Sequence, residues 1–251
     1  MADINWRGDG TVADGVRERE FEIPGARDTI TGVMWSPEGG VPANSPLVLI
    51  GHGGGGNKKA PSIVPTGRGF VLEHGIPAVA IDAPGHGERG GVAGRSPEYY
   101  ALWADSEVMT DNANADWSLV LTSLLETGWF DPERVGWSGM SMGSLIGVPY
   151  VASEPRIKVA ALGLCGTAGS TPSRSSIGGL LVNRAPLVRC PVVFIMQWND
   201  ERFTRDGSLA LFDLFGTRDK RLLSYLGAHA EMPEEGRKAG RAFVAERLKA
   251  M

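Results

Sequence analysis

The chain has 251 residues, 42% of them hydrophobic and 22% charged, with a formal net charge of -4 at pH 7. These proportions are ordinary for a globular protein and argue against a disordered chain. With no basic excess, nucleic acid is not an expected partner. Every apolar run is shorter than the ~20 residues of a spanning helix, and the first residues lack the apolar core of a signal peptide. We therefore expect no membrane partner and a cytoplasmic protein.

Short apolar runs that favour strands alternate along the chain with segments that favour helices. An antiparallel hairpin is predicted where Arg19–Ile23 and Thr29–Trp35 flank the turn at Pro24–Gly25. Further strands are predicted at Leu47–Ile50, Ala78–Ile81, Val135–Trp137, Val159–Leu164, Val192–Trp198 and Leu222–Leu226. Helices are predicted at Asp111–Glu126, Met142–Ser153, Gly207–Phe215 and Glu234–Leu248. This alternation predicts an α/β fold with a mostly parallel sheet. Residues 1–251 form one predicted domain, in which 166–189 is a possible short flap.

The most informative motif is Gly-x-Ser-x-Gly at Gly139, Ser141 and Gly143. This motif serves a sharp strand-to-helix turn that projects the serine hydroxyl, and both glycines avoid collisions at that turn. The flanking sequence supplies the required strand and helix. Ser138 fits poorly because Met140, not glycine, follows it at the second position. Ser141 is therefore the predicted nucleophile, and an ordinary glycine-rich turn is the alternative.

A serine nucleophile needs a base, and histidine is the usual one. The chain order expected for this kind of sheet is nucleophile, acid, base, and His229 alone among the four histidines follows Ser141. Asp200 is the predicted acid because it closely follows a strand, at the edge where α/β folds bind ligands. Glu201 is the close rival. A surface histidine in a turn is the alternative for His229.

A glycine-rich stretch, 51–56, follows the strand Leu47–Ile50 and can present N–H groups to an oxyanion. We assign one donor to Met142, directly after the nucleophile, and the second to the Gly53–Gly54 region, with Gly54 preferred. Nucleotide binding is the alternative. However, Lys58 is not followed by Ser or Thr, and a lone match to Gly-x-Gly-x-x-Gly is weak evidence.

Several other residues are predicted to be structural. His52 and His86 lie in glycine-flanked turns, where a ring nitrogen can bind backbone groups. Cys165 and Cys190 are expected to be buried free thiols rather than a disulfide. With two cysteines and four histidines, no zinc-type cluster is expected, and we predict no metal ion and no cofactor.

Together these motifs resemble the α/β-hydrolase superfamily, over nearly the whole chain. The residues that carry the resemblance are His52–Gly56, Asp82-Ala-Pro-Gly-His-Gly87, Gly139–Gly143, Asp200 and His229. Within this superfamily the chain resembles the compact dienelactone-hydrolase-like and prolyl-oligopeptidase-like serine esterases, which share the Asp-x-Pro-Gly-His-Gly turn. The resemblance implies an eight-stranded, mostly parallel sheet with helices on both faces, a small cap or none, and a Ser–His–Asp triad. True dienelactone hydrolases use cysteine where this chain has Ser141, and the oligopeptidases carry a large propeller domain for which this chain has no length.

The expected function is hydrolysis of carboxylic esters with short to medium acyl groups through an acyl-enzyme. Cleavage of thioesters, lactones, amides or peptides by the same triad is the alternative, and a non-catalytic binding protein on this scaffold is a further one. The candidate pocket walls are Tyr100, Trp103, Met140 and Trp198, although each could instead be a core or surface residue. The expected partner is a small-molecule ester, and the sequence does not determine the oligomeric state.

Overall fold

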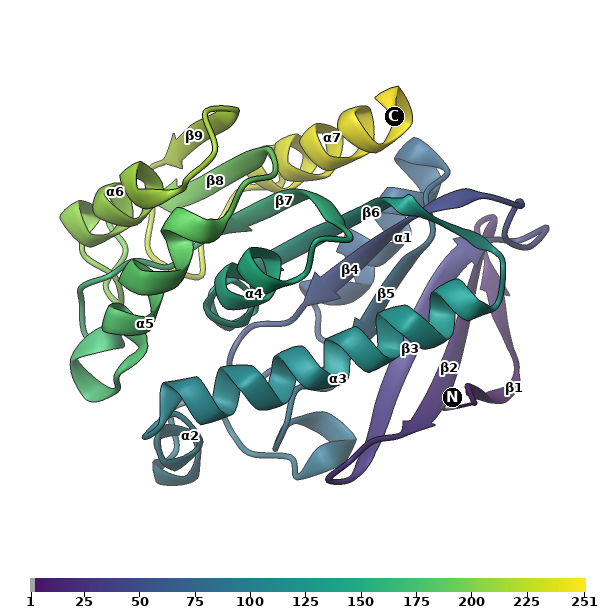
Figure 1. Cartoon of the computed structure of the whole chain (residues 1–251), viewed down its shortest axis with the longest axis horizontal. Coiled ribbons are helices and arrows are strands. Elements are labelled where there is room, and N and C mark those ends of the chain that lie inside the picture. Colours follow the sequence, from purple (N-terminus) through teal and green to yellow (C-terminus); the bar gives the residue numbers. More distant parts are fainter. Residues whose placement is uncertain (1–2) are drawn as a thin grey trace.

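A central twisted sheet organises the computed structural model, which describes residues 3–251 (Figure 1). Within these residues the sheet has nine strands in the order β1-β2-β3-β5-β4-β6-β7-β8-β9. The strands are β1 (Asn5–Ala13), β2 (Val16–Pro24), β3 (Thr29–Pro37), β4 (Ser45–Gly51), β5 (Ala78–Ile81), β6 (Phe130–Met140), β7 (Ile157–Gly163), β8 (Val192–Gln197) and β9 (Lys220–Tyr225). From β5 to β9 neighbouring strands are parallel, whereas β1, β2, β3 and β5 pair antiparallel. The predicted α/β fold with a mostly parallel sheet is confirmed.

Helices cover both faces of the sheet, as expected (Figure 1). The helices are α1 (Ile63–His74), α2 (Pro97–Leu102), α3 (Ser106–Glu126), α4 (Met142–Ser153), α5 (Ile177–Arg184), α6 (Arg205–Leu214) and α7 (Glu234–Ala250), with 3-10 turns at Gly87–Arg89, Pro172–Arg174 and Ala185–Leu187. Helices α3, α4 and α5 belong to one apolar core, and α1 and α7 to the other.

The alternation of side chains along β4 shows how one strand serves both cores. Leu47 and Leu49 point into the core shared with α3 and α4, and Val48 and Ile50 point into the core shared with α1 and α7. Successive side chains of a strand face opposite sides, so a strand covered on both faces is apolar throughout. This pattern is why the inner strands are visible in the sequence.

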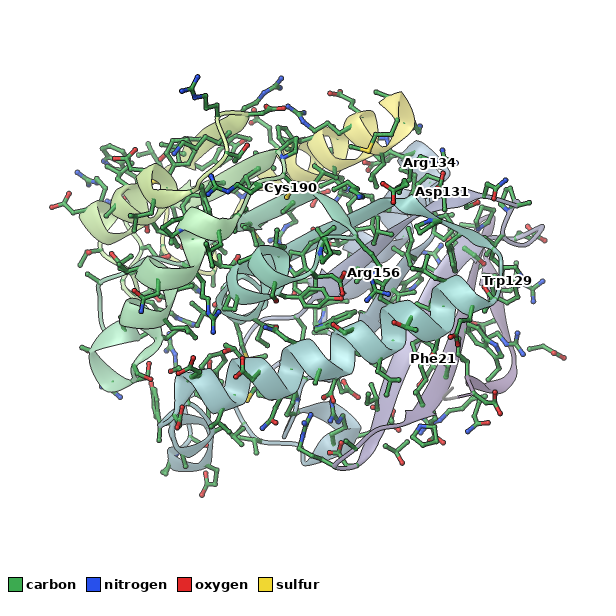
Figure 2. The ribbon with its side chains drawn as sticks, in the orientation of Figure 1. Phe21, Trp129, Asp131, Arg134, Arg156 and Cys190 are labelled. Atoms are coloured by element: carbon green, nitrogen blue, oxygen red, sulfur yellow. The ribbon has the colours of Figure 1, made fainter. Side chains whose placement is uncertain are left out.

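The implied count of eight strands is wrong by one, because β1 adds a strand to the antiparallel edge. Its sequence, NWRGDGTVA, contains two glycines and few apolar residues, and nearly all of its side chains are exposed. Backbone pairing with β2 and packing of the Trp6 ring 5.5 Å from Phe21 and 6.0 Å from Trp129 hold it in place. Figure 2 shows Phe21 and Trp129 near the C-terminal part of α3.

The helices also differ from the prediction, in starting residues and in number. Helix α3 begins at Ser106, five residues before the predicted start, because the Asp105 side chain accepts a hydrogen bond from the Val108 N–H and caps it. Helices α1, α2 and α5 were not predicted. Helix α5 lies within the proposed flap 166–189, where its Ile177 and Leu181 are fully buried. No helix of residues 3–251 is both long and apolar enough to cross a membrane.

Candidate active site

The candidate nucleophile sits at the turn between β6 and α4. Ser141 has φ 56° and ψ -121°, a backbone region that residues other than glycine rarely adopt. The Ser141 N–H donates to the Gly163 carbonyl at 2.9 Å. A Cβ atom on Gly139 would lie 2.4 Å from the Gly143 oxygen, and one on Gly143 would lie 2.2 Å from the Gly51 oxygen. Both glycines of the motif are therefore needed for the close packing of this turn.

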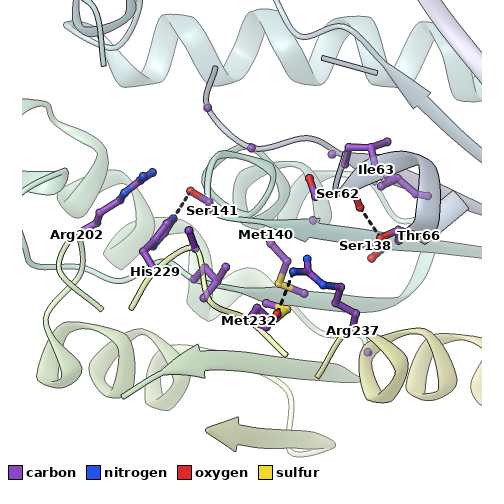
Figure 3. A pocket seen from close by; sticks show the side chains of 18 residues that line it. Ser62, Ile63, Thr66, Ser138, Met140, Ser141, Arg202, His229, Met232 and Arg237 are labelled. Atoms are coloured by element: carbon purple, nitrogen blue, oxygen red, sulfur yellow. Dashed lines mark hydrogen bonds between the residues drawn. The ribbon is translucent and has the colours of Figure 1, made fainter. Parts of the chain in front are cut away.

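The loop after β9 brings the candidate base to Ser141 (Figure 3). His229 is 4% exposed, and its Nε2 lies 2.9 Å from the Ser141 Oγ. On the other side of the ring, Nδ1 lies 2.7 Å from the Asp200 Oδ2. With Nδ1–H donating to the carboxylate, Nε2 is the free acceptor for the serine hydroxyl. This arrangement can remove the proton of a serine hydroxyl.

The loop after β8 fixes both Asp200 and its sequence rival Glu201. The other carboxylate oxygen of Asp200, Oδ1, accepts hydrogen bonds from the backbone N–H groups of Arg202 and Phe203 at 2.8 and 3.1 Å. Glu201 does not contact the imidazole; its Oε2 accepts the backbone N–H of His229 at 2.9 Å. That hydrogen bond lowers the pKa of Glu201. The two acids thus hold the ring and the backbone of His229 respectively.

The glycine-rich loop after β4 lies beside the serine. Gly53 and Gly54 line the same cavity as Ser141. The Gly53 carbonyl accepts hydrogen bonds from the Gly56 N–H at 3.0 Å and from the His52 Nδ1 at 2.9 Å. Met142 is the first residue of α4, and N–H groups in the first turn of a helix have no acceptor within the helix. Gly53, Gly54 and Met142 therefore all lie beside Ser141.

The side chain of His52 holds this loop in place through both ring nitrogens. Besides the Gly53 contact, its Nε2 accepts the Ala83 N–H at 3.0 Å, which links the glycine-rich loop to the turn after β5. Burial lowers the pKa of His52 to about 4, so the ring is neutral near pH 7 and can accept this hydrogen bond. The Nδ1 atom of His86 lies 2.9 Å from the carbonyl oxygen of Pro84. Both histidines thus bind backbone groups, as the sequence predicted.

Two cavities meet at Ser141. The first, of about 280 Å³, is largely apolar and is lined by residues of α1, β6, the end of β7 and the segment after His229, among them Ile63, Met140, Leu164 and Met232 (Figure 3). The second, of about 410 Å³, is more polar and is lined by Tyr100, Leu145, Phe203 and several charged side chains. Gly54, Ser141 and Arg202 border both cavities.

The predicted pocket walls divide between these cavities and other places. Met140 lines the first cavity and Tyr100 the second. Trp103 is instead 3% exposed and packs in the core. Trp198 is 40% exposed and lines neither cavity; the Arg205 guanidinium stacks 3.8 Å from the centre of its ring. The placement of these two tryptophans in the pocket is corrected: Trp103, directly after α2, packs in the core, and Trp198, directly after β8, faces solvent beside Arg205.

Known proteins place this geometry in a family. No protein-family model and no curated protein matches the chain. Among solved structures, a cold-adapted esterase from an Arctic intertidal metagenomic library, in complex with PEG, is 37% identical, with a TM-score of 0.84 over 97% of this chain and 99% of that one. The chain belongs to the α/β-hydrolase superfamily. At this identity the membership extends to the carboxylic ester hydrolases within it, and the predicted resemblance is confirmed.

More distant α/β-hydrolases share the fold alone. Acetyl xylan esterase 1 from Thermoanaerobacterium is 17% identical, with a TM-score of 0.77 over 98% of this chain and 88% of that one. An acylaminoacyl peptidase from Pyrococcus horikoshii is also 17% identical, with a TM-score of 0.67, and the match covers 94% of this chain and 42% of the peptidase.

A buried ion pair supports the turn after β5 in this α/β-hydrolase. Asp82 is fully buried, and its carboxylate accepts hydrogen bonds from the Thr31 hydroxyl at 2.7 Å and from the Lys58 backbone N–H and Nζ at 2.8 and 3.1 Å. Burial alone would raise the pKa of Asp82, but these hydrogen bonds and the Lys58 charge lower it. Lys58, considered above for a phosphate loop, also contacts Glu88. It is therefore already paired with acidic side chains.

Sequence reasoning missed the charged lining of this α/β-hydrolase site. Arg95, Arg174, Glu201 and Arg202 line the second cavity, and they come from three separate loops. No motif joins these positions. Across residues 3–251, no group of three or more His, Cys, Asp or Glu side chains is placed to hold a metal ion. Cys165 and Cys190 are free, the first buried and the second half-buried.

Proposed function

We propose that this α/β-hydrolase cleaves carboxylic esters with Ser141 as nucleophile, His229 as general base and Asp200 as the acid that orients the imidazole. The observation that carries the proposal is the continuous contact from the Ser141 Oγ to His229 and on to Asp200, at 2.9 and 2.7 Å. Both distances lie in the range required for proton transfer between a nucleophile and its base.

The proposed reaction begins with attack of the Ser141 Oγ on the ester carbonyl carbon, while the His229 Nε2 takes the hydroxyl proton. The Asp200 carboxylate stabilises the imidazolium that forms. The imidazolium then protonates the leaving alcohol, and an acyl-serine remains. A water molecule, deprotonated by His229, attacks the acyl carbon and releases the carboxylic acid.

The N–H groups of Met142 and Gly54 are the proposed donors to the oxyanion, with Gly53 adjacent. Preorganised donors of this kind are often the largest single contribution to catalysis. The His52 contact holds the Gly53 carbonyl, so that this peptide keeps a fixed orientation. Gly54 packs against Tyr99: a Cβ atom on Gly54 would lie 2.6 Å from the Tyr99 hydroxyl oxygen. The loop carrying the donors is thus held from two sides.

The triad is tested by substituting its members singly. Ser141→Ala and His229→Gln are each expected to lower kcat/KM for p-nitrophenyl acetate by roughly 10⁴- to 10⁶-fold, and Asp200→Asn by roughly 10⁴-fold, since these groups act as a unit. The matched controls are Ser153→Ala and Asp213→Asn, both exposed and remote from the cavities, which should stay within twofold. Full activity of Ser141→Ala would refute the proposal.

Covalent labelling separates the proposed enzyme from a binding protein. A fluorophosphonate should modify Ser141 in the folded wild-type chain and leave Ser141→Ala unlabelled, as read by peptide mass spectrometry. Kinetics on matched ester, thioester, lactone and aminoacyl amide substrates then distinguish the ester proposal from its alternatives. A higher kcat/KM on the amide or thioester would replace the ester as the proposed substrate.

The apolar cavity favours short to medium acyl groups. Its volume of about 280 Å³ lies just below the range of roughly 300–1,000 Å³ that is usual for small-molecule sites. A series of p-nitrophenyl esters from acetyl to palmitoyl is therefore expected to show maximal kcat/KM at or below the medium-chain members. A maximum at palmitoyl would contradict this assignment.

A further inference from the structure

The second cavity beside Ser141 carries an excess of positive charge. Its lining contains three guanidinium groups, those of Arg95, Arg174 and Arg202, and one carboxylate, that of Glu201. The hydroxyl-bearing residues Ser170 and Thr171 complete the polar part of its wall. The apolar cavity on the other side of the nucleophile is bordered by Arg202 and Arg237, and Arg237 donates to the Met232 carbonyl at 2.9 Å and lies 3.6 Å from Glu234.

The single carboxylate does not satisfy the three arginines. Glu201 Oε1 lies 3.6 Å from Arg95 and 3.5 Å from the Arg202 Nε, distances of loose ion pairs rather than strong hydrogen bonds. The Arg202 Nε is buried from solvent and has no hydrogen-bond partner among residues 3–251. The opposite oxygen of Glu201 is occupied by the His229 backbone N–H. Guanidinium donors therefore remain free at this cavity.

Arg174 is positioned by a ring rather than by an acid. Its guanidinium carbon lies 5.0 Å from the centre of the Tyr100 ring, and no ion pair of Arg174 occurs within the described part of the chain. Stacking of a guanidinium on an aromatic face leaves its N–H groups available at the edge. Arg202, in turn, borders Ser141 in both cavities, which places one of these charges next to the reacting centre (Figure 3).

From this arrangement we infer that the second cavity binds an anionic group of the substrate, a carboxylate, and that the preferred substrates are esters of acids or alcohols that carry such a charge. Guanidinium groups match a carboxylate in geometry and charge, and their hydrogen bonds to it are among the stronger ones in proteins. The inference rests on the proposed function of Ser141. It assigns the charged part of the ester to the arginine-lined cavity and the uncharged part to the apolar cavity.

Matched pairs of small esters test the inference, because an amide is a neutral replacement for a carboxylate. One pair carries the difference on the acyl side, monomethyl succinate against methyl succinamate. The other carries it on the alcohol side, 4-acetoxybenzoate against 4-acetoxybenzamide. Each kcat/KM is divided by the rate constant of hydroxide-catalysed hydrolysis, which removes differences in intrinsic reactivity. We expect the anionic member to be preferred about tenfold or more in at least one pair, and the preference to fall as NaCl is raised.

Substitutions then assign the preference to residues. Arg174→Gln and Arg202→Gln should each reduce the anion-to-amide ratio roughly ten- to hundredfold, the loss of one charge-assisted contact. Arg205→Gln is the matched control: it removes the same charge from the neighbouring α6, where Arg205 stacks on Trp198 outside both cavities. Its ratio should equal that of the wild type.

Glu201→Gln should change the ratio in the opposite direction. It removes the competing negative charge but keeps an oxygen that can accept the His229 N–H, so the anionic ester should gain relative to the amide. A merely structural role of these residues would not produce opposite signs. A ratio below twofold in both pairs, or one that survives both arginine substitutions, overturns the inference. If p-nitrophenyl acetate is still hydrolysed through Ser141 in that case, the proposed function stands.

Discussion

At the scale of single residues, Ser141 shows what the short motif demands of its neighbours. A non-glycine residue held in a sparsely populated backbone region costs of order 1–3 kcal/mol, so the surroundings must enforce it. They do so through the hydrogen bond from the Ser141 N–H to the Gly163 carbonyl. The close packing of Gly139 and Gly143, which leaves no room for a Cβ atom, also holds the turn. The hydroxyl gains its position beside His229 from this strained turn.

Two glycines that lie in helices distinguish the steric requirement at this turn from the ordinary helix propensity of alanine over glycine. Gly143→Ala in α4 would place a Cβ atom 2.2 Å from the Gly51 oxygen, and we expect it to destabilise the protein by about 2 kcal/mol or more, within the range for overpacking. Gly179→Ala in α5 meets no atom within 4 Å and should stabilise by about 0.5–1 kcal/mol. Urea unfolding of both variants checks the pair. Equal effects of the two substitutions on the free energy of unfolding would show that the turn between β6 and α4 tolerates a side chain at position 143.

The candidate site divides into residues that the sequence could indicate and residues that it could not. Ser141, Asp200 and His229 follow from a motif, from chain order and from proximity to strand ends, and the structure brings their side chains together. Arg95 lies in the loop before α2 and Arg174 in the 3-10 turn Pro172–Arg174, and these two segments meet only in the fold. Neither the spacing of residues nor the composition indicates that these segments lie side by side in the folded chain.

At the scale of elements, the inner strands were predictable because burial on both faces makes them continuously apolar. The same argument explains the failures. β1 buries almost nothing, so its composition carries no strand signal. Helix α1 contains Gly67 and Gly69, which disfavour a helix in isolation, yet a Cβ atom on Gly67 would lie 2.2 Å from the Trp35 ring. Here close packing against β3 outweighs local propensity.

At the scale of the whole molecule, two loops at the carboxyl ends of β4 and β5 are joined by buried histidines. His52 binds backbone groups of both loops and is 2% exposed, and His86 is fully buried beside it, with ring centres 5.3 Å apart. Burial lowers the pKa of both rings. The folded protein therefore favours the neutral form of both rings, and acid should lower its stability.

The two pKa values of His52, folded and unfolded, determine how much acid lowers the free energy of unfolding. Its pKa is about 4 in the folded chain, and the unfolded value is about 6.5. The unfolded chain therefore binds more protons between these values, and the free energy of unfolding falls as the pH drops through this range. With a limiting slope of about 1.4 kcal/mol for each pH unit, His52 accounts for a loss of about 2 kcal/mol between pH 7.5 and 5, above the range in which ordinary carboxylates titrate. His86 acts in the same direction.

Urea unfolding at several pH values from 7.5 to 5, for the wild type and for His52→Gln, isolates this contribution. The variant should be less stable than the wild type at pH 7.5, because it disturbs the contacts of His52 to both loops, but it should lose less stability on acidification. The difference between the two curves should therefore narrow by about 2 kcal/mol as the pH falls to 5. Parallel curves would mean that the His52 ring is protonated in the folded protein as readily as in the unfolded chain, and that its hydrogen bond from Ala83 does not depend on a neutral ring.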